Sequence, residues 1–413
     1  MAKKKLLIFS DCFTYSGSEN VIENIRLSQK INLEFDVYFV YGYNSSYQAR
    51  LEERSAYLGL SNENVSPIYL LSPDWAINKY NLSGISLKKA ALFIRVIFLK
   101  VFKLLFISHL YNFLSLKRRL KKISPDVLYI NNGGYPASLQ CCVAVFAASA
   151  IKLNNIYFNI NNLATPINKF YEKRLDAYIN RHVTKFITAS FAAGEHALHN
   201  RLLQAGKFIR IPNTINNEAF LAEKYGSEKG LNPVLTFGSV GLLTNRKGYH
   251  ILLEAARILV HEQNVTDFKI KLIGDGEDRP LLQELCEKYD IENYVAFLGF
   301  KPNPLDELSD FDVFVLPSIK NEDFPYVILE AMILAKPVIG TKIAGIPEQV
   351  SNSASGFLIE PNNASDLANA MVKFLSDKAV INEMGLKGRK KYMNEFRYSI
   401  IEDLYFKLFT SSN

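Results

Sequence analysis

The sequence LPSIKNEDFPYVILEAMILAKPVIGT, from Leu316 to Thr341, predicts a strand, a loop and a helix in immediate succession. An apolar run, Phe311 to Leu316, indicates a buried parallel strand that stops at Pro317. After a polar loop, Pro325 is well placed as the first residue of a helix whose apolar positions continue to Ile333. A helix that begins beyond the carboxyl end of a strand offers N–H groups to an anion, and open α/β sheets bind ligands there.

The length and composition indicate a globular protein with several cores. The chain has 413 residues, of which 48% are hydrophobic and 22% are charged, enough for two or three domains. The four cysteines, Cys12, Cys141, Cys142 and Cys286, lack the spacing of a metal site or a disulfide framework. We therefore expect reduced core thiols in a cytosolic protein.

The chain begins MAKKKLLIFSDCF, which has a basic start but only four apolar residues before Ser10 and Asp11. This pattern predicts a first strand and not a signal peptide. Strand Lys4 to Ser10, helix Glu19 to Gln29 and strand Phe35 to Val40 then form a βαβ unit of ordinary length. Gly17, in the turn between them, either lets the backbone approach a ligand closely or is an ordinary turn glycine.

The same alternation continues along the whole chain and predicts an α/β fold with two doubly wound parallel sheets that face an interdomain cleft. We expect a Rossmann-like domain over residues 1–215 and a second over 216–395, with the polar segment 213–233 acting as the linker. Residues 396–413 are expected to form a helix that packs back towards the first domain. Turns that contain Gly, Asn or Pro follow most strands, as is typical of a ligand-facing rim and equally of ordinary turns.

The segment 88–122 carries the basic character of the chain. It holds ten Lys or Arg residues and no Asp or Glu, whereas the net charge of the whole chain is +7. Helical spacing places the cations of its first half opposite its apolar residues, which predicts a basic amphipathic helix. Its longest run without charge has 13 residues, too few for a bilayer core that needs about 20. The segment either lies on an anionic membrane surface or is a core helix with a solvated basic face.

Several motifs together resemble retaining glycosyltransferases of family 4, which have the GT-B fold. Glu322 and Glu330 have E-x7-E spacing within EDFPYVILEAM, and AKPVIGT and AGIPEQV follow. The KG pair after the first strand of the second domain and the turn GDG add to the likeness. The resemblance is dense over residues 234–361 and thin over the first domain, where SGSE, SPDVLYINNGG and IPNTI carry it.

The resemblance implies a nucleotide-sugar donor held mainly by the second domain. Glu322 and Lys247 would be the catalytic residues: Glu322 would face the transferred sugar, and Lys247 would bind the diphosphate. Glu330 would accept hydrogen bonds from the ribose hydroxyls. The full expected donor site comprises Gly17, Arg246, Lys247, Gly274, Gly299, Phe300, Lys301, Asp323, Phe324, Pro325, Tyr326, Val327 and Glu330. Asn132, Asn161 and Asn162, in turns of the first domain, are the expected acceptor-binding residues.

Two positions depart from the family pattern. Leu242 stands where family members commonly carry an arginine, and Arg246 is the candidate to supply the missing charge. Asn161 or Asn162 stands where a histidine is often found, and an amide cannot take up a proton near neutral pH. A front-face mechanism, in which the leaving phosphate accepts the acceptor's proton, would need no such histidine.

The predicted function is transfer of a sugar, with retention of configuration, from a nucleotide diphosphate sugar to a glycan or lipid-linked glycan in bacterial surface-polysaccharide synthesis, such as capsule, O-antigen or exopolysaccharide. We expect a UDP-sugar rather than a GDP-sugar, no cofactor, no metal requirement and no nucleic-acid partner. The expected location is the cytoplasm, peripheral at the inner face of the cell membrane. Two alternatives remain at this stage: a nucleotide-sugar epimerase of GT-B-like fold, and a catalytically silent nucleotide-sugar-binding partner protein.

Overall fold

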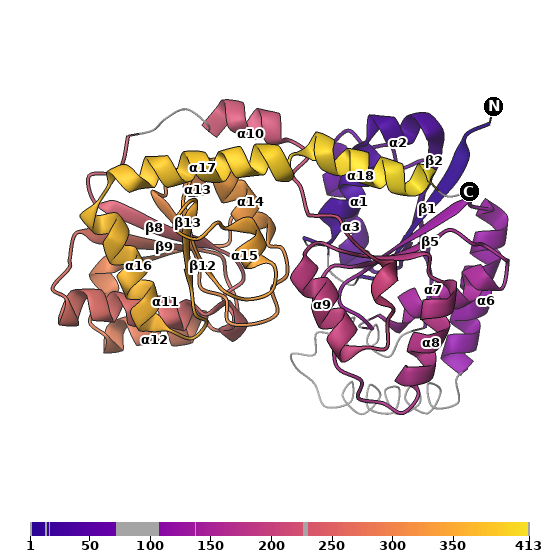
Figure 1. Ribbon diagram of the computed structural model, residues 1–413, viewed down its shortest axis with the longest axis horizontal. Coiled ribbons are helices and arrows are strands. Elements are labelled where there is room, and N and C mark those ends of the chain that lie inside the picture. The colour runs from indigo at the N-terminus through magenta and orange to yellow at the C-terminus, as the bar shows by residue number, and fades with distance from the viewer. Residues whose placement is uncertain are drawn as a thin grey trace. The chain divides into compact units, whose positions relative to one another are not determined.

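The computed structural model describes residues 2–12, 15, 17–71, 107–136, 138–225 and 230–411. The chain forms two compact units. Unit 1 contains residues 1–188, 194–211 and 402–413, and unit 2 contains residues 189–193 and 212–401. Figure 1 labels many of the helices and strands of both units.

Unit 1 is built on a seven-stranded parallel sheet in the order β3-β2-β1-β4-β5-β6-β7. Its strands are β1 (Lys4–Ser10), β2 (Phe35–Gly42), β3 (Val65–Ile68), β4 (Val127–Asn132), β5 (Ile156–Ile160), β6 (Lys185–Thr188) and β7 (Phe208–Arg210). Its helices are α1 (Glu19–Leu27), α2 (Gln29–Glu34), α3 (Ser45–Tyr57), α6 (Ile107–Ile123), α7 (Leu139–Ser149), α8 (Glu172–His182) and most of α9 (Phe191–Asn200). The strand order reverses between β1 and β4, and the carboxyl ends of the strands at such a point are the usual ligand position of a doubly wound sheet.

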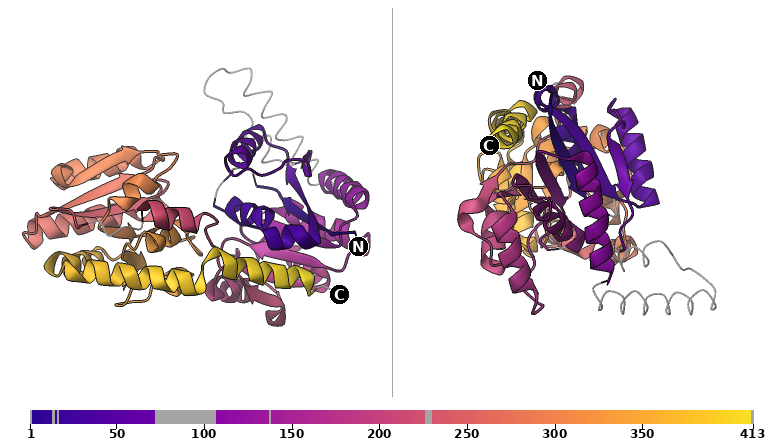
Figure 2. Two further views of the ribbon diagram at one scale, coloured as in Figure 1. Left: turned by 90° about the horizontal axis from the view of Figure 1, so that it is seen from above. Right: turned by 90° about the vertical axis from the view of Figure 1, so that its right-hand side faces the viewer.

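The last helix, α18 (Tyr398–Thr410), supplies part of the core of unit 1. Phe409 is fully buried, and its ring centroid lies 5.9 Å from that of Tyr129 on β4 and 6.4 Å from that of Phe35 on β2. Ser28, between α1 and α2, donates a hydrogen bond of 2.7 Å to Glu402, and Figure 2 shows α18 beside these elements. The carboxyl terminus of the chain therefore belongs to the amino-terminal unit.

Unit 2 repeats the architecture with six parallel strands in the order β10-β9-β8-β11-β12-β13. Its strands are β8 (Leu235–Val240), β9 (Phe268–Ile273), β10 (Val295–Gly299), β11 (Val313–Leu316), β12 (Val338–Thr341) and β13 (Gly356–Ile359). Its helices are α10 (Glu218–Tyr225), α11 (Tyr249–Arg257), α12 (Arg279–Lys288), α13 (Leu305–Ser309), α14 (Tyr326–Ile333), α15 (Ile346–Gln349), α16 (Ala364–Ser376) and α17 (Ala379–Glu395). The two parallel sheets confirm the predicted fold class.

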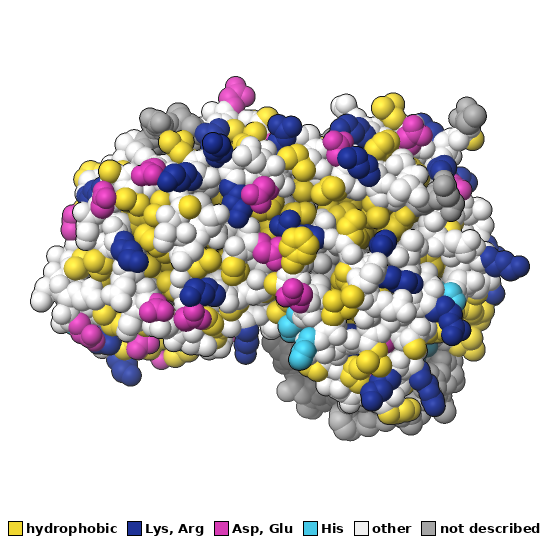
Figure 3. All heavy atoms as spheres, in the orientation of Figure 1, with side chains coloured by type: hydrophobic (Ala, Val, Ile, Leu, Met, Phe, Trp, Pro, Cys, Tyr) yellow, Lys and Arg dark blue, Asp and Glu magenta, His cyan; other side chains and the backbone are white. Residues whose placement is uncertain are grey.

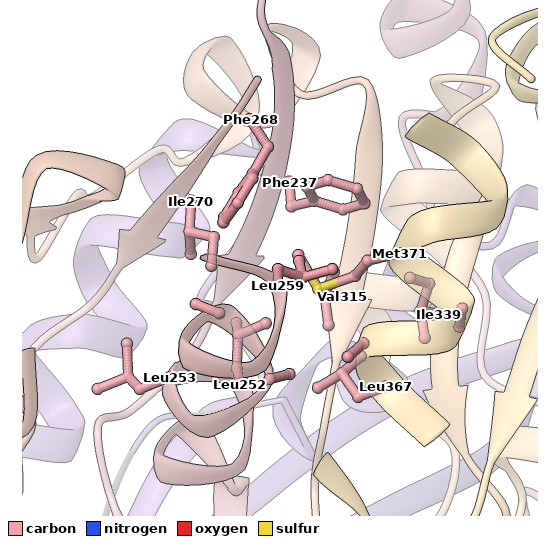
Figure 4. Close-up of a cluster of buried hydrophobic side chains, with 14 of the residues drawn as sticks. Phe237, Leu252, Leu253, Leu259, Phe268, Ile270, Val315, Ile339, Leu367 and Met371 are labelled. Atoms are coloured by element: carbon pink, nitrogen blue, oxygen red, sulfur yellow. The ribbon is translucent and has the colours of Figure 1, made fainter. Parts of the chain in front are cut away.

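Helices cover both faces of the unit 2 sheet, and each face has its own core. Figure 4 shows one core, where Leu252 of α11 and Met371 of α16 meet Phe237 and Phe268 from the sheet. On the other face α14 packs against α17, with Ile328 and Leu329 fully buried. The strands carry apolar residues on both faces because both faces are covered, which explains why they appear in the sequence as continuous apolar runs.

The structure corrects the expected linker and describes part of the basic segment. The segment 213–233 is not a simple linker, because α10 lies within it and buries Leu221 and Tyr225, one helical turn apart, in the core of unit 2. In the basic segment 88–122, α6 confirms a helix from Ile107 onwards, whereas residues 88–106 lie outside the described residues. Within the described residues, no helix combines the length and the apolar character needed to cross a membrane.

All four cysteines are free, and three of them are buried. Burial raises the pKa of the Cys142 thiol and of the Cys286 thiol to about 12, so both remain protonated at neutral pH. The structure therefore agrees with inert core thiols at these positions.

Candidate functional site

The candidate site in unit 2 lies where the strand order changes direction. From β8 the chain proceeds to β9 and β10 on one side, and β11, β12 and β13 occupy the other side. The loops that leave the carboxyl ends of β8 and β11 therefore diverge, and the crevice between them is the usual ligand position of a doubly wound sheet. Residues 241–248 follow β8, and residues 317–325 follow β11.

These two loops are joined by backbone contacts. Ile319 N–H donates a hydrogen bond of 2.8 Å to the carbonyl of Arg246. Gly248 has a φ of +70°, and a Cβ built on it would lie 2.0 Å from the carbonyl oxygen of Pro317. Only glycine allows this approach, so the position of the basic residues before Gly248 is fixed against the end of β11.

Two cations and one carboxylate meet across the joined loops. Arg246 Nη1 lies 2.9 Å and Lys247 Nζ 2.5 Å from Glu322 Oε1. Ser318 Oγ, at the end of β11, donates to the same oxygen at 3.3 Å. The Lys247 and Glu322 side chains are 11% and 9% exposed, whereas Arg246 is 36% exposed. The cluster therefore keeps one net positive charge, which suits an anionic ligand.

Helix α14 begins directly beyond this cluster. Pro325 is its N-cap and provides no side-chain hydrogen bond, so the helix starts one residue later than the sequence predicted. Gln349 Nε2 donates 3.1 Å to the Pro325 carbonyl and fixes the position of the first turn. The positive end of the helix dipole adds to the field of Arg246 and Lys247.

Glu330 lies about one turn further along α14. It is partly buried and has no hydrogen-bond or ion-pair partner among the residues that the structure describes. Burial alone raises the pKa of its carboxyl group to about 7. A carboxylate that is desolvated without compensation is costly, and ligand hydroxyl groups would remove that cost.

The glycines of the predicted donor site allow close packing of loops. Gly274, after β9, has a φ of +136°, and a Cβ there would lie 1.9 Å from the carbonyl oxygen of Gly241. Gly241 N–H in turn donates 2.9 Å to Ile273, and Gly274 N–H donates 2.9 Å to Gly299. The structure thus joins the ends of β8, β9 and β10 into one rim.

Other predicted donor residues lie on or near this rim with different degrees of exposure. Phe300 is 62% exposed, and Lys301 forms an ion pair of 3.1 Å with Glu307. Asp323 and Phe324 are buried, and the Asp323 carboxylate accepts a short hydrogen bond from Ser190. Tyr326 and Val327, in the first turn of α14, are partly buried.

Sequence reasoning missed two residues of this site. Ser318 is fully buried and donates to Glu322. Thr244 has a buried hydroxyl group that has no hydrogen-bond partner within the described part of the chain. The place of Ser318 directly after the apolar strand was a usable signal, whereas nothing in the sequence marked Thr244.

The predicted acceptor residues belong to unit 1, at the carboxyl ends of β4 and β5. Asn161 Nδ2 donates 2.8 Å to Asn131 Oδ1 and 2.8 Å to the Asn132 carbonyl, and Asn159 Nδ2 donates 2.8 Å to Asn161 Oδ1. Asn132 is almost fully buried and donates to the Gly134 carbonyl at 2.8 Å. These amides hold the rim of unit 1 in shape.

Asn162 and Gly17 lie at the same edge of unit 1. Asn162 Oδ1 accepts a hydrogen bond of 2.8 Å from Leu163 N–H. The turn that contains Gly17 is tied to β4, because Asn131 Nδ2 donates 3.2 Å to the Ser18 carbonyl. Unit 1 therefore has its own polar rim at the point where its strand order changes direction.

Comparisons with known proteins agree with this geometry. Residues 226–391 match the family model of the group 1 glycosyl transferases. A putative colanic acid biosynthesis glycosyltransferase of Escherichia coli K12, WcaL, is 36% identical over 171 residues, which cover 40% of this chain and 42% of that protein. The chain therefore spans less than half the length of this relative.

Most of the chain is similar in sequence to another enzyme of Escherichia coli, the UDP-Gal:α-D-GlcNAc-diphosphoundecaprenol α-1,3-galactosyltransferase. It is 28% identical over 316 residues, which cover 72% of this chain and 80% of that protein. Among solved structures, Anabaena HepE in complex with UDP has a TM-score of 0.72 at 18% identity and covers 98% of this chain and all of its own. The chain thus has the GT-B fold of glycosyltransferases, and its residues 226–391 match the group 1 glycosyl transferases.

Proposed function

We propose that this protein is a retaining glycosyltransferase that moves a sugar from a nucleotide diphosphate sugar to a lipid-linked glycan during bacterial surface-polysaccharide synthesis. The observation that carries the proposal is the contact of Arg246, Lys247 and Glu322 at the start of α14, inside the stretch that matches the family. Relatives with names from colanic acid, amylovoran and capsule synthesis support the biological setting.

In this proposal the donor lies along the carboxyl edge of the unit 2 sheet. Lys247, Arg246 and the first turn of α14 bind the diphosphate, and Glu330 accepts hydrogen bonds from the ribose hydroxyls. Gly274, Gly299, Phe300 and Lys301 border the nucleotide. Asp323, Phe324, Pro325, Tyr326 and Val327 form the loop and helix start beside the sugar. Gly17 of unit 1 remains a proposed contact to the diphosphate.

The proposed reaction needs no protein base. The bond between the anomeric carbon and the diphosphate oxygen breaks, and the acceptor oxygen bonds to the same face of that carbon. The acceptor's proton passes to the leaving diphosphate, whose charge Lys247 and Arg246 stabilise. Glu322 stabilises the positive charge that develops on the sugar ring. Asn161 and Asn162, which cannot take a proton, then serve with Asn132 to shape or bind the acceptor.

The donor is proposed to be a UDP-sugar, because solved neighbours are complexes with UDP and with UDP-glucose and one relative is named for UDP-galactose. The same relative is named for a diphosphoundecaprenol acceptor, which supports a lipid-linked acceptor here. We propose that no metal or cofactor is required, and that the protein works at the cytoplasmic face of the membrane with the basic segment 88–122 against anionic lipid.

The test is transfer by the purified protein from a panel of UDP-sugars to diphosphoundecaprenol-linked acceptors, with the anomeric configuration of the product read by NMR. Glu322→Gln should lower kcat by a factor on the order of 10² to 10³ and leave UDP affinity nearly unchanged. Activity should survive EDTA. A wild-type protein that binds a UDP-sugar without transferring or hydrolysing it would indicate a silent binding partner, and conversion of the donor to its epimer would indicate an epimerase.

A further inference from the structure

A cavity with a strongly basic wall lies in unit 1, beside helix α6 and the end of β3. Its volume is about 370 Å³. Among its lining residues three are cationic and two are tyrosines, and no described Asp or Glu lines it. The residues that matter here are Tyr69, Tyr111, Ser115, Arg118, Arg119 and Lys122. None of them belongs to the proposed donor or acceptor sites.

One face of α6 supplies most of this wall. Tyr111, Ser115, Arg118 and Lys122 are separated by four, three and four residues, so they lie on the same side of the helix. In Figure 3 the side chains that lie over α6 include Lys and Arg, drawn in dark blue. The cavity therefore lies between this face of α6 and the end of β3.

Two residues of the wall are held in place by the fold. Arg119 donates 2.8 Å to Ser66 Oγ and 3.2 Å to the Pro67 carbonyl, which uses only part of its five N–H donors. The Tyr69 ring packs on the ring of Tyr43, with their centroids 4.6 Å apart, and yet it is 63% exposed. A guanidinium and an aromatic ring are thus fixed before any ligand binds.

The other two cations lack a counter-ion. Arg118 and Lys122 are exposed and have no hydrogen-bond or ion-pair partner among the described residues. Three positive charges without a carboxylate around one cavity favour a phosphate, and arginine matches the geometry of phosphate oxygens particularly well.

Exposed apolar side chains next to the cavity favour a membrane lipid over a soluble phosphate as its ligand. On the same helix, Leu110 is 57% exposed, Leu114 is 40% exposed and Tyr111 is 44% exposed. Exposed leucines and tyrosines that adjoin basic residues are typical of segments that lie in the interface of a bilayer.

We infer that this cavity binds the phosphate of an anionic phospholipid headgroup, with Arg118, Arg119 and Lys122 around the phosphate and Tyr69 and Tyr111 at the level of the interface. The inference rests on the membrane location given in the proposed function and assigns that contact to a specific pocket. It does not depend on the donor site of unit 2.

The experiment is co-sedimentation of the full chain with vesicles of phosphatidylcholine that contain 30% phosphatidylglycerol. The pocket variant is Arg118→Ser with Lys122→Ser. The control variant, Lys117→Ser with Lys121→Ser, removes the same charge from the same helix, but these lysines do not line the cavity. We expect about 30-fold weaker vesicle binding for the pocket variant. For the control variant we expect binding to weaken by no more than about threefold.

Equal losses in the two variants would overturn the pocket and leave only diffuse electrostatic attraction. Binding to pure phosphatidylcholine vesicles as strong as to the anionic vesicles would also overturn it. Soluble glycerol phosphate at millimolar concentration should not release the wild-type protein from vesicles; release would identify a soluble phosphate site in place of a lipid site. UDP-sugar affinity of each variant is measured in parallel, so that failure of this inference and failure of the proposed donor site give different results.

Discussion

Glu330 shows most clearly how one residue links stability to the proposed ligand. Its side chain is partly buried and has no hydrogen-bond or ion-pair partner among the described residues, and burial raises the pKa of its carboxyl group from 4.5 to about 7. Between these two pH values the folded protein holds this proton more tightly than the unfolded chain. The resulting stabilisation is present below pH 4.5 and is lost as the pH rises through about 7.

Replacing Glu330 by Gln should therefore stabilise the free protein at pH 8, by up to roughly 3 kcal/mol, and should have little effect at pH 4.5. Thermal unfolding of both proteins across this pH range measures the difference. Glu287→Gln, at an exposed position of α12, is the control and should be neutral throughout. A gain from Glu330→Gln that does not change with pH would show that the raised pKa is not its cause.

Arg246 is the second residue to which the contacts in the structure give a specific proposed role. It reaches Glu322 at 2.9 Å and the Asn321 carbonyl at 3.3 Å, whereas Leu242 is 56% exposed in the same loop. The side chain that lies next to the Glu322 carboxylate is thus Arg246 and not Leu242. Arg246 is therefore the candidate to supply the positive charge that glycosyltransferases of family 4 commonly carry at the position of Leu242.

We expect Arg246→Met to weaken UDP binding about tenfold or more, because a charge-assisted hydrogen bond contributes roughly 1.5–3 kcal/mol. Leu242→Met should have no measurable effect in the same calorimetric titration. Adding Leu242→Arg to Arg246→Met should restore part of the affinity if both positions reach the diphosphate. Undiminished affinity in Arg246→Met would remove this residue from the proposed donor site.

At the scale of elements, the site depends on how closely neighbouring loops approach. The loop after β9 lies against the loop after β8, and no side-chain atom of residue 274 fits between them. The loop after β8 continues to Lys247, so a displacement at Gly274 is transmitted to the cation cluster within a few residues.

Gly274→Ala should lower UDP affinity and the melting temperature together, since its φ of +136° and the 1.9 Å approach to Gly241 both oppose a side chain. A cost of about 1–3 kcal/mol is expected for such strain. Gly230→Ala is the matched control, because a Cβ there meets nothing within 4 Å. Equal behaviour of the two variants in calorimetry and thermal unfolding would contradict the proposed loop packing.

In the whole molecule, the last residues of the chain pack in the core of unit 1, although they follow unit 2 in sequence. Residues 402–411 follow unit 2 in sequence, yet Tyr405 and Phe409 pack on the sheet of unit 1. The Tyr157 hydroxyl donates 2.9 Å to the Leu408 carbonyl, which adds a polar contact to the apolar ones. The stability of unit 1 therefore depends on the last residues of the chain.

Phe409→Ala should destabilise unit 1 by about 3–5 kcal/mol, as expected for a fully buried phenylalanine. Hydrogen exchange should show reduced protection in β1, β4 and β5 and little change in β8 and β9. Phe220→Ala, at a side chain of α10 that is 53% exposed, serves as the control. Loss of protection centred on unit 2 would contradict the assignment of these residues to unit 1.

The fold class and most of the elements could be predicted from the sequence, because parallel strands covered on both faces are continuous apolar runs with a turn residue after each. The predicted strands Lys4–Ser10 and Ile156–Ile160 coincide with β1 and β5. The polar composition of segment 213–233 predicts a linker, because only a few of its residues, chiefly Leu221 and Tyr225 of α10, make core contacts.

Which residues contact one another could be learned only from the three-dimensional fold. The fold brings Arg246, Lys247, Ser318 and Glu322 together, because the strand order places β8 beside β11 although 72 residues lie between the end of β8 and the start of β11 along the chain. It also leaves Glu330 without a partner among the described residues and places Phe409 in the first unit. Spacing along a chain records local periodicity, whereas contacts between loops depend on strand order and close backbone approach, which no single segment of sequence specifies.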